Sequence, residues 1–226
     1  MHILLTDILA CPRCGPEFGL VLLADRVEER RVLEGRLGCP NCREQYPVRG
    51  GAVDARLPGA ASAGDGSADG ARSGEASSDD AGAGVRLAAL LGLADARGTV
   101  LIAGPGAALA AEVAALVPEL EVVALAAEPD GGDPQPGVTR IAAGDRLPFR
   151  SRTLRGVALT GGAGAARLAE GVRVLQPGAR LVVEGAPAGT AGVLAGLGAQ
   201  VMLEQEGTVV VRAVGEPVPL TMNAVR

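Results

Sequence analysis

The four cysteines of the sequence fall into two Cys-x-x-Cys pairs. Cys11 and Cys14 form the first pair, Cys39 and Cys42 the second, and 24 residues lie between the pairs. In each pair the chain can turn so that both sulfurs face one ion, and two pairs complete a tetrahedron of thiolates with no open position. The spacing therefore predicts a structural, non-catalytic zinc site. Two disulfides or a redox-active pair are the alternatives, and the matched pairs favour zinc.

The segment between the two pairs has the pattern of a β-hairpin. Short apolar runs at residues 19–23 and 31–35 are separated by charged residues. Two antiparallel strands joined by a tight turn return the chain to its starting point, which would bring the second cysteine pair to the first. His2 lies far from this pattern, and we do not expect it to be a ligand.

The composition excludes several classes of function. Hydrophobic residues make up 48% of the 226 residues, which is enough for a core. No stretch reaches the roughly 18 uncharged apolar residues of a membrane span. The net charge of -5 at pH 7 argues against a chain built mainly to hold nucleic acid, because phosphate binding requires clustered positive charge. The amino-terminal segment lacks the basic start and long apolar run of a secretory signal, so we expect a cytoplasmic protein.

A stretch without large side chains divides the chain. Residues 55–84 are mostly Gly, Ala, Ser and Asp, and such a segment cannot bury enough apolar surface to offset its ordering entropy. We therefore predict a zinc ribbon at residues 1–54, a disordered linker at 55–84, a larger domain at 85–214 and a tail at 215–226.

The larger domain alternates apolar runs with helical patterns, which is typical of a mostly parallel sheet with helices on its faces. Its last two strands flank Glu206 and Gly207, which predicts a hairpin at one edge. The expected fold class is α/β, with a four-cysteine zinc ribbon followed by a Rossmann-like sheet that ends in a hairpin. Strands are predicted at residues 99–103, 121–126, 138–142, 155–160, 180–184, 199–203 and 208–214, and helices at 85–93, 107–116, 165–175 and 188–196.

The ribbon segment resembles a known family. The motifs LTDILACPRC at residues 5–14, LEGRLGCPNC at 33–42 and QYPVRGG at 45–51 are similar to the zinc-ribbon activator subunit of tRNA and translation-factor methyltransferases. The resemblance covers about residues 3–53. It implies a ribbon without catalytic groups that holds a methyltransferase by strand pairing and apolar contact. The expected partner is a separate methyltransferase or the chain's own C-terminal domain.

The larger domain resembles class I methyltransferases that use S-adenosylmethionine. Residues 100–108 (VLIAGPGAA) read as a strand, a Gly-x-Gly turn and a helix start, and the blocks AGDRLPF at 143–149 and LAEGVRVLQPGARLVV at 168–183 follow in the family's order. The resemblance implies that Gly104, Gly106 and Asp145 contact the cofactor, with Glu128 as a substitute for the acid that holds the ribose.

Two acids that the resemblance leads us to expect are missing. Ile102 stands where active relatives carry the acid that meets the methionine ammonium, and Ala126 stands at the end of the second strand, where the ribose acid belongs. The family's third glycine is replaced by Ala108, and residues 161–165 show neither an acceptor loop nor a nucleophile. A buried hydroxyl or ammonium without its partner costs about 1–3 kcal/mol. These departures predict weak or absent binding of S-adenosylmethionine.

Two hypotheses follow, and the sequence alone leaves enzymatic activity undecided. One is a zinc-binding, non-catalytic scaffold or activator of a methyltransferase, that is, a pseudoenzyme. The other is an active S-adenosylmethionine-dependent methyltransferase that acts on RNA, protein or a small molecule. The missing acids favour the first, whereas the intact turn from Gly104 to Gly106 and the retained Asp145 support the second.

Overall fold

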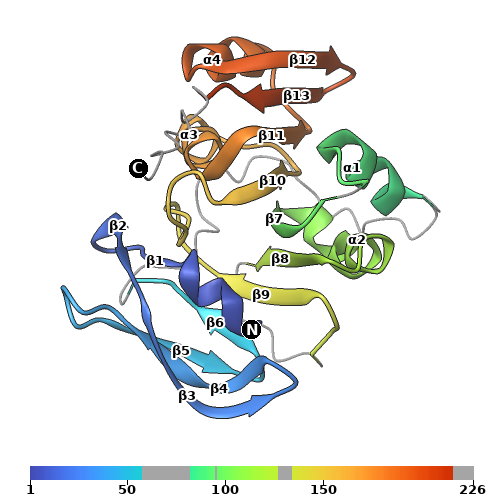
Figure 1. Ribbon diagram of the computed structural model, residues 1–226. Helices are drawn as coiled ribbons and strands as arrows, with labels where there is room; N and C mark the ends of the chain where they lie inside the picture. Colours follow the sequence, from blue (N-terminus) through green and yellow to red (C-terminus); the bar gives the residue numbers. More distant parts are fainter. Residues whose placement is uncertain (58–81, 95, 127–133, 216–226) are drawn as a thin grey trace, which may run out of the picture.

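The computed structural model describes residues 1–57, 82–94, 96–126 and 134–215. These parts of the chain form one sheet of 11 strands with helices on both faces, and a two-stranded sheet beside it (Figure 1). Most of the predicted linker, residues 58–81, and most of the predicted tail, residues 216–226, lie outside the described residues.

The amino-terminal unit is the predicted ribbon with its hairpin. Strands β3 and β4 pair antiparallel along their length. The two turn residues Glu29 and Arg30 have φ values of 45° and 64°, which suit the right-handed twist of a tight hairpin. The elements of this unit are the 3₁₀ turn η1 (Ile3–Asp7) and the strands β1 (Ala10–Cys11), β2 (Gly15–Gly19), β3 (Val21–Glu28), β4 (Arg31–Gly38), β5 (Gln45–Arg49) and β6 (Ala52–Asp54).

The carboxyl-terminal unit is the predicted Rossmann-like sheet. Its strands lie in the order β9-β8-β7-β10-β11-β13-β12. The first five strands are parallel, and β13 is antiparallel to both of its neighbours. This is the class I methyltransferase arrangement that the resemblance implied. The strands are β7 (Gly98–Ala103), β8 (Leu120–Ala126), β9 (Val138–Ala142), β10 (Leu154–Leu159), β11 (Leu175–Glu184), β12 (Ala199–Gln205) and β13 (Thr208–Ala213).

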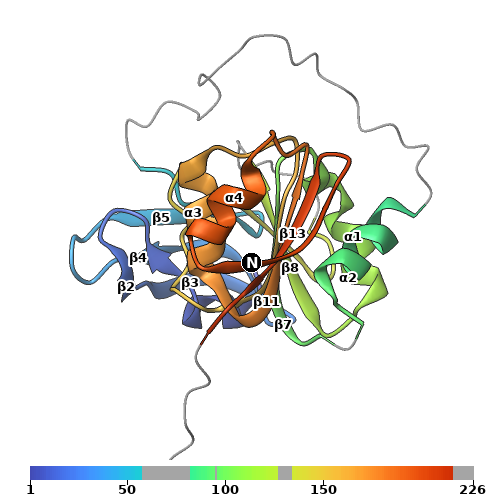
Figure 2. The ribbon, with the colours of Figure 1, turned by 90° about the horizontal axis from the view of Figure 1, so that it is seen from above.

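The helices cover both faces of this sheet, as Figure 2 shows. Helices α1 and α2 lie on one face, whereas α3, α4 and the ribbon lie on the other. The helical elements are α1 (Ala83–Leu91), the 3₁₀ turn η2 (Pro105–Leu109), α2 (Ala110–Leu116), α3 (Ala165–Val174) and α4 (Thr190–Gly196).

Several boundaries differ from the predicted ones. Helix α1 begins at Ala83, so the last residues assigned to the linker are helical. The helix predicted from residue 107 starts as a 3₁₀ turn at Pro105, because proline suits the first turn of a helix. Helix α4 begins at Thr190 rather than at residue 188. Strand β11 extends back to Leu175, which pairs with Leu154 across a register shift.

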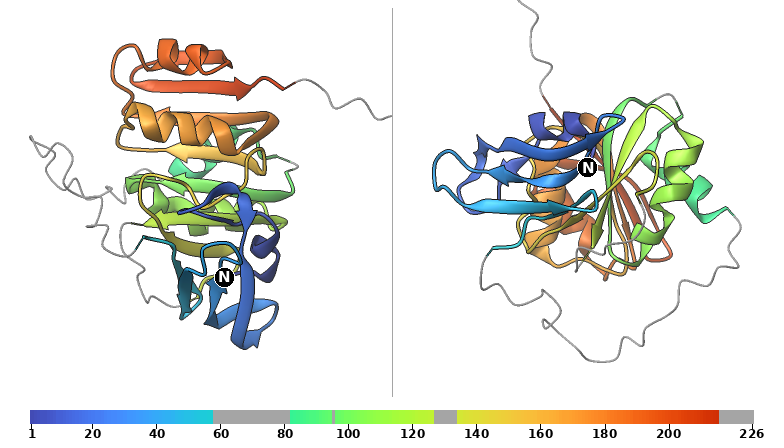
Figure 3. Two further views of the ribbon diagram at one scale, coloured as in Figure 1. Left: turned by 90° about the vertical axis from the view of Figure 1, so that its left-hand side faces the viewer. Right: turned by 90° about the horizontal axis from the view of Figure 1, so that it is seen from below.

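The ribbon and the larger unit share one sheet, which the sequence did not predict. Strand β6 pairs in parallel with β9, Val53 opposite Ile141 and Asp54 opposite Ala142. The N–H of Ala55 donates to the carbonyl of Ala142 at 2.8 Å, so the pairing continues one residue past the predicted boundary of the ribbon. Figure 3 shows the ribbon strands continuing the sheet beyond β9.

The core is continuous across this junction. One cluster of buried side chains contains ribbon residues such as Leu37 and Val53 together with Ile141, Leu101 and Leu181 of the larger unit. Two aromatic residues, Tyr46 and Phe149, are almost fully buried in it, with exposed fractions of 1% and 0%. The two predicted domains are therefore packed as one body in the described structure.

No helix in the described segments is both long and apolar enough to cross a bilayer.

Candidate functional site

The four cysteines converge as the spacing predicted. Their sulfur atoms all lie within 4.8 Å of one another, and none forms a disulfide. The Sγ atoms of Cys11 and Cys42 are 3.7 Å apart, and those of Cys14 and Cys39 are 3.8 Å apart. Four thiolates at a Zn–S distance of about 2.3 Å would lie about 3.8 Å from one another at the corners of a tetrahedron. The donor set and its spacing therefore fit a closed zinc site.

Hydrogen-bond donors surround these sulfurs. The N–H of Cys14 donates to Cys11 Sγ at 3.4 Å, and Asn41 Nδ2 donates to Cys14 Sγ at 3.3 Å. The Tyr46 hydroxyl lies 3.3 Å from Cys11 Sγ. Burial and the neighbouring cysteine sulfur raise the pKa of Tyr46 well above its ordinary value, so the hydroxyl keeps its proton and can donate to a thiolate. Sequence reasoning missed this role of Tyr46.

The loop after β9 lies against the first cysteine pair. The N–H of Ala10 donates to the carbonyl of Pro148 at 3.0 Å, and that of Arg150 to the carbonyl of Ile8 at 2.8 Å. Arg146 Nη1 also donates to the carbonyl of Pro12 at 3.3 Å, inside the Cys11–Cys14 turn. The cysteine-bearing end of the ribbon is therefore held against the larger unit by hydrogen bonds.

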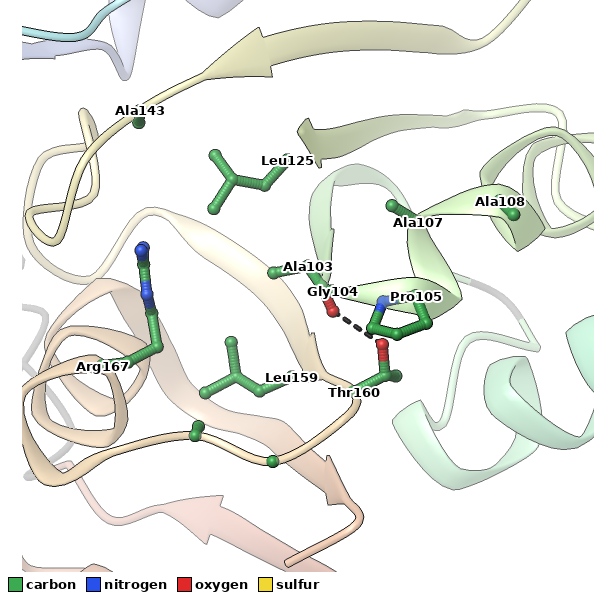
Figure 4. A pocket seen from close by; sticks show the side chains of 12 residues that line it. Ala103, Gly104, Pro105, Ala107, Ala108, Leu125, Ala143, Leu159, Thr160 and Arg167 are labelled. Carbon is green, nitrogen blue, oxygen red and sulfur yellow. Dashed lines mark hydrogen bonds between the residues drawn. The ribbon is translucent and has the colours of Figure 1, made fainter. Parts of the chain in front are cut away.

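A cavity of about 620 Å³ opens at the carboxyl ends of the parallel strands. It is bordered by the ends of β7, β8, β9 and β10 (Figure 4). In an open α/β sheet this crevice is where ligands generally bind. Its wall is mainly aliphatic and includes Ala103, Leu125, Ala143 and Leu159.

The glycine turn at the rim is held by Thr160. The Thr160 hydroxyl accepts the N–H of Gly106 at 2.7 Å and donates to the carbonyl of Ala103 at 2.8 Å. Gly104 has a φ of 82°, and a Cβ there would overlap the carbonyl oxygen of Thr160. A Cβ on Gly106 would lie 2.7 Å from the Thr160 methyl group. Both glycines are thus required for close packing of this turn, independently of any ligand.

The four predicted cofactor contacts do not all meet at the cavity. Gly104 lines it, but the N–H of Gly106 is bonded to Thr160 rather than turned to a ligand. Asp145 is exposed and is not among the lining residues. Glu128 lies outside the described residues.

The residues that replace the family's acids are also located. Ile102 is fully buried in the cluster under helices α1 and α2, which is separate from the cluster that borders the cavity. Ala108 lines the cavity, and Ala126 is the last residue of β8. No acidic side chain is found among the described residues that line the cavity.

Arg167, which sequence reasoning did not single out, is the one charged residue among the described residues that line the cavity. It comes from the first turn of α3 and points toward the space between Ala143 and Leu159 (Figure 4). Its Nη2 donates to the carbonyl of Gly144 at 2.9 Å, whereas its Nη1 is buried without a hydrogen-bond partner. Burial lowers the pKa of Arg167, although nearby Asp145 partly opposes this effect.

Comparison with known proteins assigns the ribbon. Residues 2–51 match the family described as Trm112p-like protein. No curated protein sequence matches the chain significantly. The amino-terminal segment is therefore a Trm112p-like zinc-ribbon domain.

Solved structures similar to the chain include several described as methyltransferases and one described as the [4+2]-cyclase SpnF. The antibiotic-resistance methyltransferase Kmr is 14% identical, with 59% of this chain and 93% of that chain covered and a TM-score of 0.45. The 1,6-didemethyltoxoflavin-N1-methyltransferase of Burkholderia thailandensis is 15% identical, with 58% and 76% covered and a TM-score of 0.44. The complex of the Haloferax volcanii Trm112 methyltransferase activator with a putative methyltransferase is 15% identical, with 57% and 89% covered and a TM-score of 0.40.

Proposed function

We propose that this chain is a non-catalytic, methyltransferase-like protein whose zinc ribbon acts in cis, with its own carboxyl-terminal unit as the partner. The observation that carries the proposal is the cavity wall, which offers the cation of Arg167 and no carboxylate among the described lining residues. S-adenosylmethionine carries a sulfonium and an ammonium cation besides its carboxylate. Arg167 would suit the carboxylate, but the two cations need anionic or polar anchors. Two missing anchors would weaken its binding roughly a hundredfold.

The cis arrangement is supported by the use of the ribbon's edge strand. A ribbon that serves a separate enzyme needs a free strand edge, because strand pairing uses the unpaired N–H and C=O groups of that edge. One edge strand of the ribbon, β6, is already paired with β9 of the same chain, and Val53 on β6 has an exposed fraction of 0%, whereas the other, β3, is the last strand of the 11-stranded sheet. This pairing favours the chain's own C-terminal unit over a separate enzyme as the partner.

Zinc would be held by Cys11, Cys14, Cys39 and Cys42. A bound ion would supply folding energy to this small unit and no open coordination position for a substrate. The segment around the first cysteine pair forms hydrogen bonds with the loop at residues 146–150. A bound ion that stabilises the ribbon would therefore also stabilise this loop of the larger unit.

An active S-adenosylmethionine-dependent methyltransferase is the second candidate. The observation in its favour is the cavity itself, whose volume of about 620 Å³ lies within the usual range for small-molecule and cofactor sites. Gly104, which the sequence resemblance assigns to the cofactor turn, lines the cavity. Under this alternative, Asp145 and Glu128 would supply the polar contacts to the cofactor.

Titration calorimetry of the full-length, zinc-loaded protein distinguishes the two candidates. With S-adenosylmethionine and its demethylated product, S-adenosylhomocysteine, we expect no detectable heat or a Kd weaker than tens of micromolar. A Kd of a few micromolar or below that is lost in both Asp145→Ala and Glu128→Ala would establish the second candidate. Asp25→Ala, which removes an exposed acid from the ribbon strand β3, is the matched control and should not change the titration.

A further inference from the structure

The described wall of the cavity carries a cation and no acid, whereas the sequence resemblance led us to expect acids there. Its described wall combines aliphatic side chains, such as Leu125 and Leu159, with the guanidinium of Arg167. A guanidinium presents several N–H groups in a rigid plane that matches the oxygens of a carboxylate or a phosphate. The wall therefore favours an anion over a cation.

Arg167 also has unused hydrogen-bonding capacity. Its Nη2 is fixed by the carbonyl of Gly144 at 2.9 Å, which holds the side chain in place, but Nη1 is buried and has no partner. A buried donor without a partner is costly, on the order of 1–3 kcal/mol, and such groups normally have a structural or ligand-binding explanation.

Neighbouring carboxylates do not provide that explanation. Glu170, one turn further along α3, is engaged by Arg173 at 2.7 Å and by the N–H of Leu147 at 2.8 Å. Asp145 is exposed, and within the described residues no ion pair of 4.0 Å or less joins a carboxylate to Arg167.

Two neutral donors of the glycine turn are already bonded. The N–H of Gly106 and the hydroxyl of Thr160 are paired with each other and with Ala103. A ligand's polar group would therefore find its charged contact at Arg167, on the opposite side of the cavity from the glycine turn (Figure 4).

We propose that this cavity binds a small organic oxyanion, a carboxylate or phosphate monoester, with its charged group on the Arg167 guanidinium and its neutral body against the aliphatic wall. This inference rests on the proposed function, because it assigns the cavity to a ligand other than the methyl donor. A volume of about 620 Å³ can accommodate a body as large as a nucleoside.

The test compares anionic probes with neutral probes of similar shape on the full-length, zinc-loaded protein. Adenosine 5′-monophosphate is compared with adenosine, and 4-phenylbutyrate with 4-phenylbutyramide, so that the two pairs separate phosphate from carboxylate. Calorimetry and ligand-observed NMR should give at least one anionic probe a tenfold lower Kd than its neutral partner, which corresponds to about 1.4 kcal/mol. That preference should fall to within twofold in Arg167→Gln and survive in part in Arg167→Lys.

The matched control is Arg36→Gln, which removes one positive charge from an exposed position on the ribbon strand β4 and should keep the full preference. Thermal melting of Arg167→Gln verifies that the variant is folded. Equal affinity for both members of each pair, a preference that persists in Arg167→Gln, or no binding of any probe at millimolar concentration would overturn the inference. None of these outcomes alters the separate titration with S-adenosylmethionine, so the proposed function can stand or fall on its own.

Discussion

Arg31 of the ribbon and Glu121 of strand β8 form a bidentate ion pair across the junction of the two units. The Nη1–Oε1 distance is 3.1 Å and the Nη2–Oε2 distance is 2.9 Å. Arg31 Nη1 also donates to the carbonyl of Val138 at 3.0 Å, and the Thr139 hydroxyl donates to Glu121. This ion pair lies at the amino end of β9. The hydrogen bonds between residues 148–150 and the segment around the first cysteine pair lie beyond the carboxyl end of β9, so the ribbon is held at both ends of this strand.

Replacement of Arg31 by alanine should destabilise the whole chain. Its side chain and that of Glu121 have exposed fractions of only 17% and 12%, so the substitution leaves a largely buried carboxylate without its cation. Complete burial would make this cost about 3–5 kcal/mol, and partial exposure reduces the expected loss to about 1–3 kcal/mol. Urea unfolding should show this loss as a lower midpoint.

The matched control for that prediction is Arg26→Ala, which breaks an exposed pair with Glu28 on the same ribbon. It should cost less than about 1 kcal/mol. A double-mutant cycle with Glu121→Gln should give a coupling energy well above the uncertainty of the measurement, and a coupling near zero would contradict the role assigned to the pair.

Phe149→Ala tests whether the two units share a single core. Phe149 is fully buried in the cluster that contains ribbon side chains, and it forms a bridge with Leu9. The loss of so large a buried side chain should cost about 3–5 kcal/mol. The chain should still unfold in one transition, detected both by far-UV circular dichroism and by zinc release. Phe18→Ala, at a position with 38% exposure, is the control and should cost much less.

The parts of this molecule that were predictable depend on local patterns. The Cys-x-x-Cys spacing predicted that the four cysteines would converge, and the alternation of apolar runs identified the parallel strands and the Glu206–Gly207 hairpin, whose turn residues have φ values of 48° and 74°. The junction could not be predicted in this way. The pairing of Val53 with Ile141 joins residues that are far apart in the sequence, and a three-residue strand carries no signal of its partner.

Contacts between residues far apart in the sequence also explain why the cavity was not fully predicted. The sequence pattern identified Gly104 and Gly106 as a cofactor turn, whereas the structure gives both residues a packing role against Thr160, more than 50 residues away. Arg167 belongs to no recognisable sequence motif. It lines the cavity only because the fold brings it next to residues at the ends of several strands. Residues that act through distant packing are therefore the ones that sequence reasoning missed.

Tyr46→Phe should weaken zinc binding without unfolding the zinc-saturated protein. The variant removes the hydroxyl that lies 3.3 Å from Cys11 Sγ and keeps the buried ring. Loss of an outer hydrogen bond to a metal ligand typically lowers metal affinity by about 10–100-fold, and we expect about tenfold here. Competition with a chromophoric chelator measures the change. Asn41→Ala, which removes the exposed donor to Cys14, should have a smaller effect, and equal affinities of wild type and Tyr46→Phe would contradict the prediction.

Gly104→Ala should destabilise the protein even when no ligand is present. Gly104 has a φ of 82°, and its Cβ would overlap the backbone of Thr160. Strain of this kind costs on the order of 1–3 kcal/mol, to which the steric overlap adds. Gly144→Ala is the control, since a Cβ there meets nothing within 4 Å. If thermal melting of Gly104→Ala matched that of wild type, the glycine would have to be explained by ligand binding instead.

Glu170 should contribute an acid-sensitive part of the stability. Burial alone would raise the pKa of Glu170, but hydrogen bonds from Arg173 and from the N–H of Leu147 outweigh it and hold the pKa below its ordinary value. A carboxylate with a lowered folded-state pKa stabilises the protein fully above its unfolded pKa of about 4.3, and this contribution disappears as the pH falls through the lower folded value. Glu170→Gln should therefore be less stable than wild type by about 1–3 kcal/mol at pH 7, with the difference closing below pH of about 4.

Urea unfolding between pH 7 and pH 3 measures this difference, and release of zinc at low pH affects both proteins alike. Glu204→Gln, at an exposed position on β12, should follow wild type throughout, and a wild-type-to-Glu170→Gln difference that did not change with pH would show that the carboxylate's charge is not what stabilises this contact.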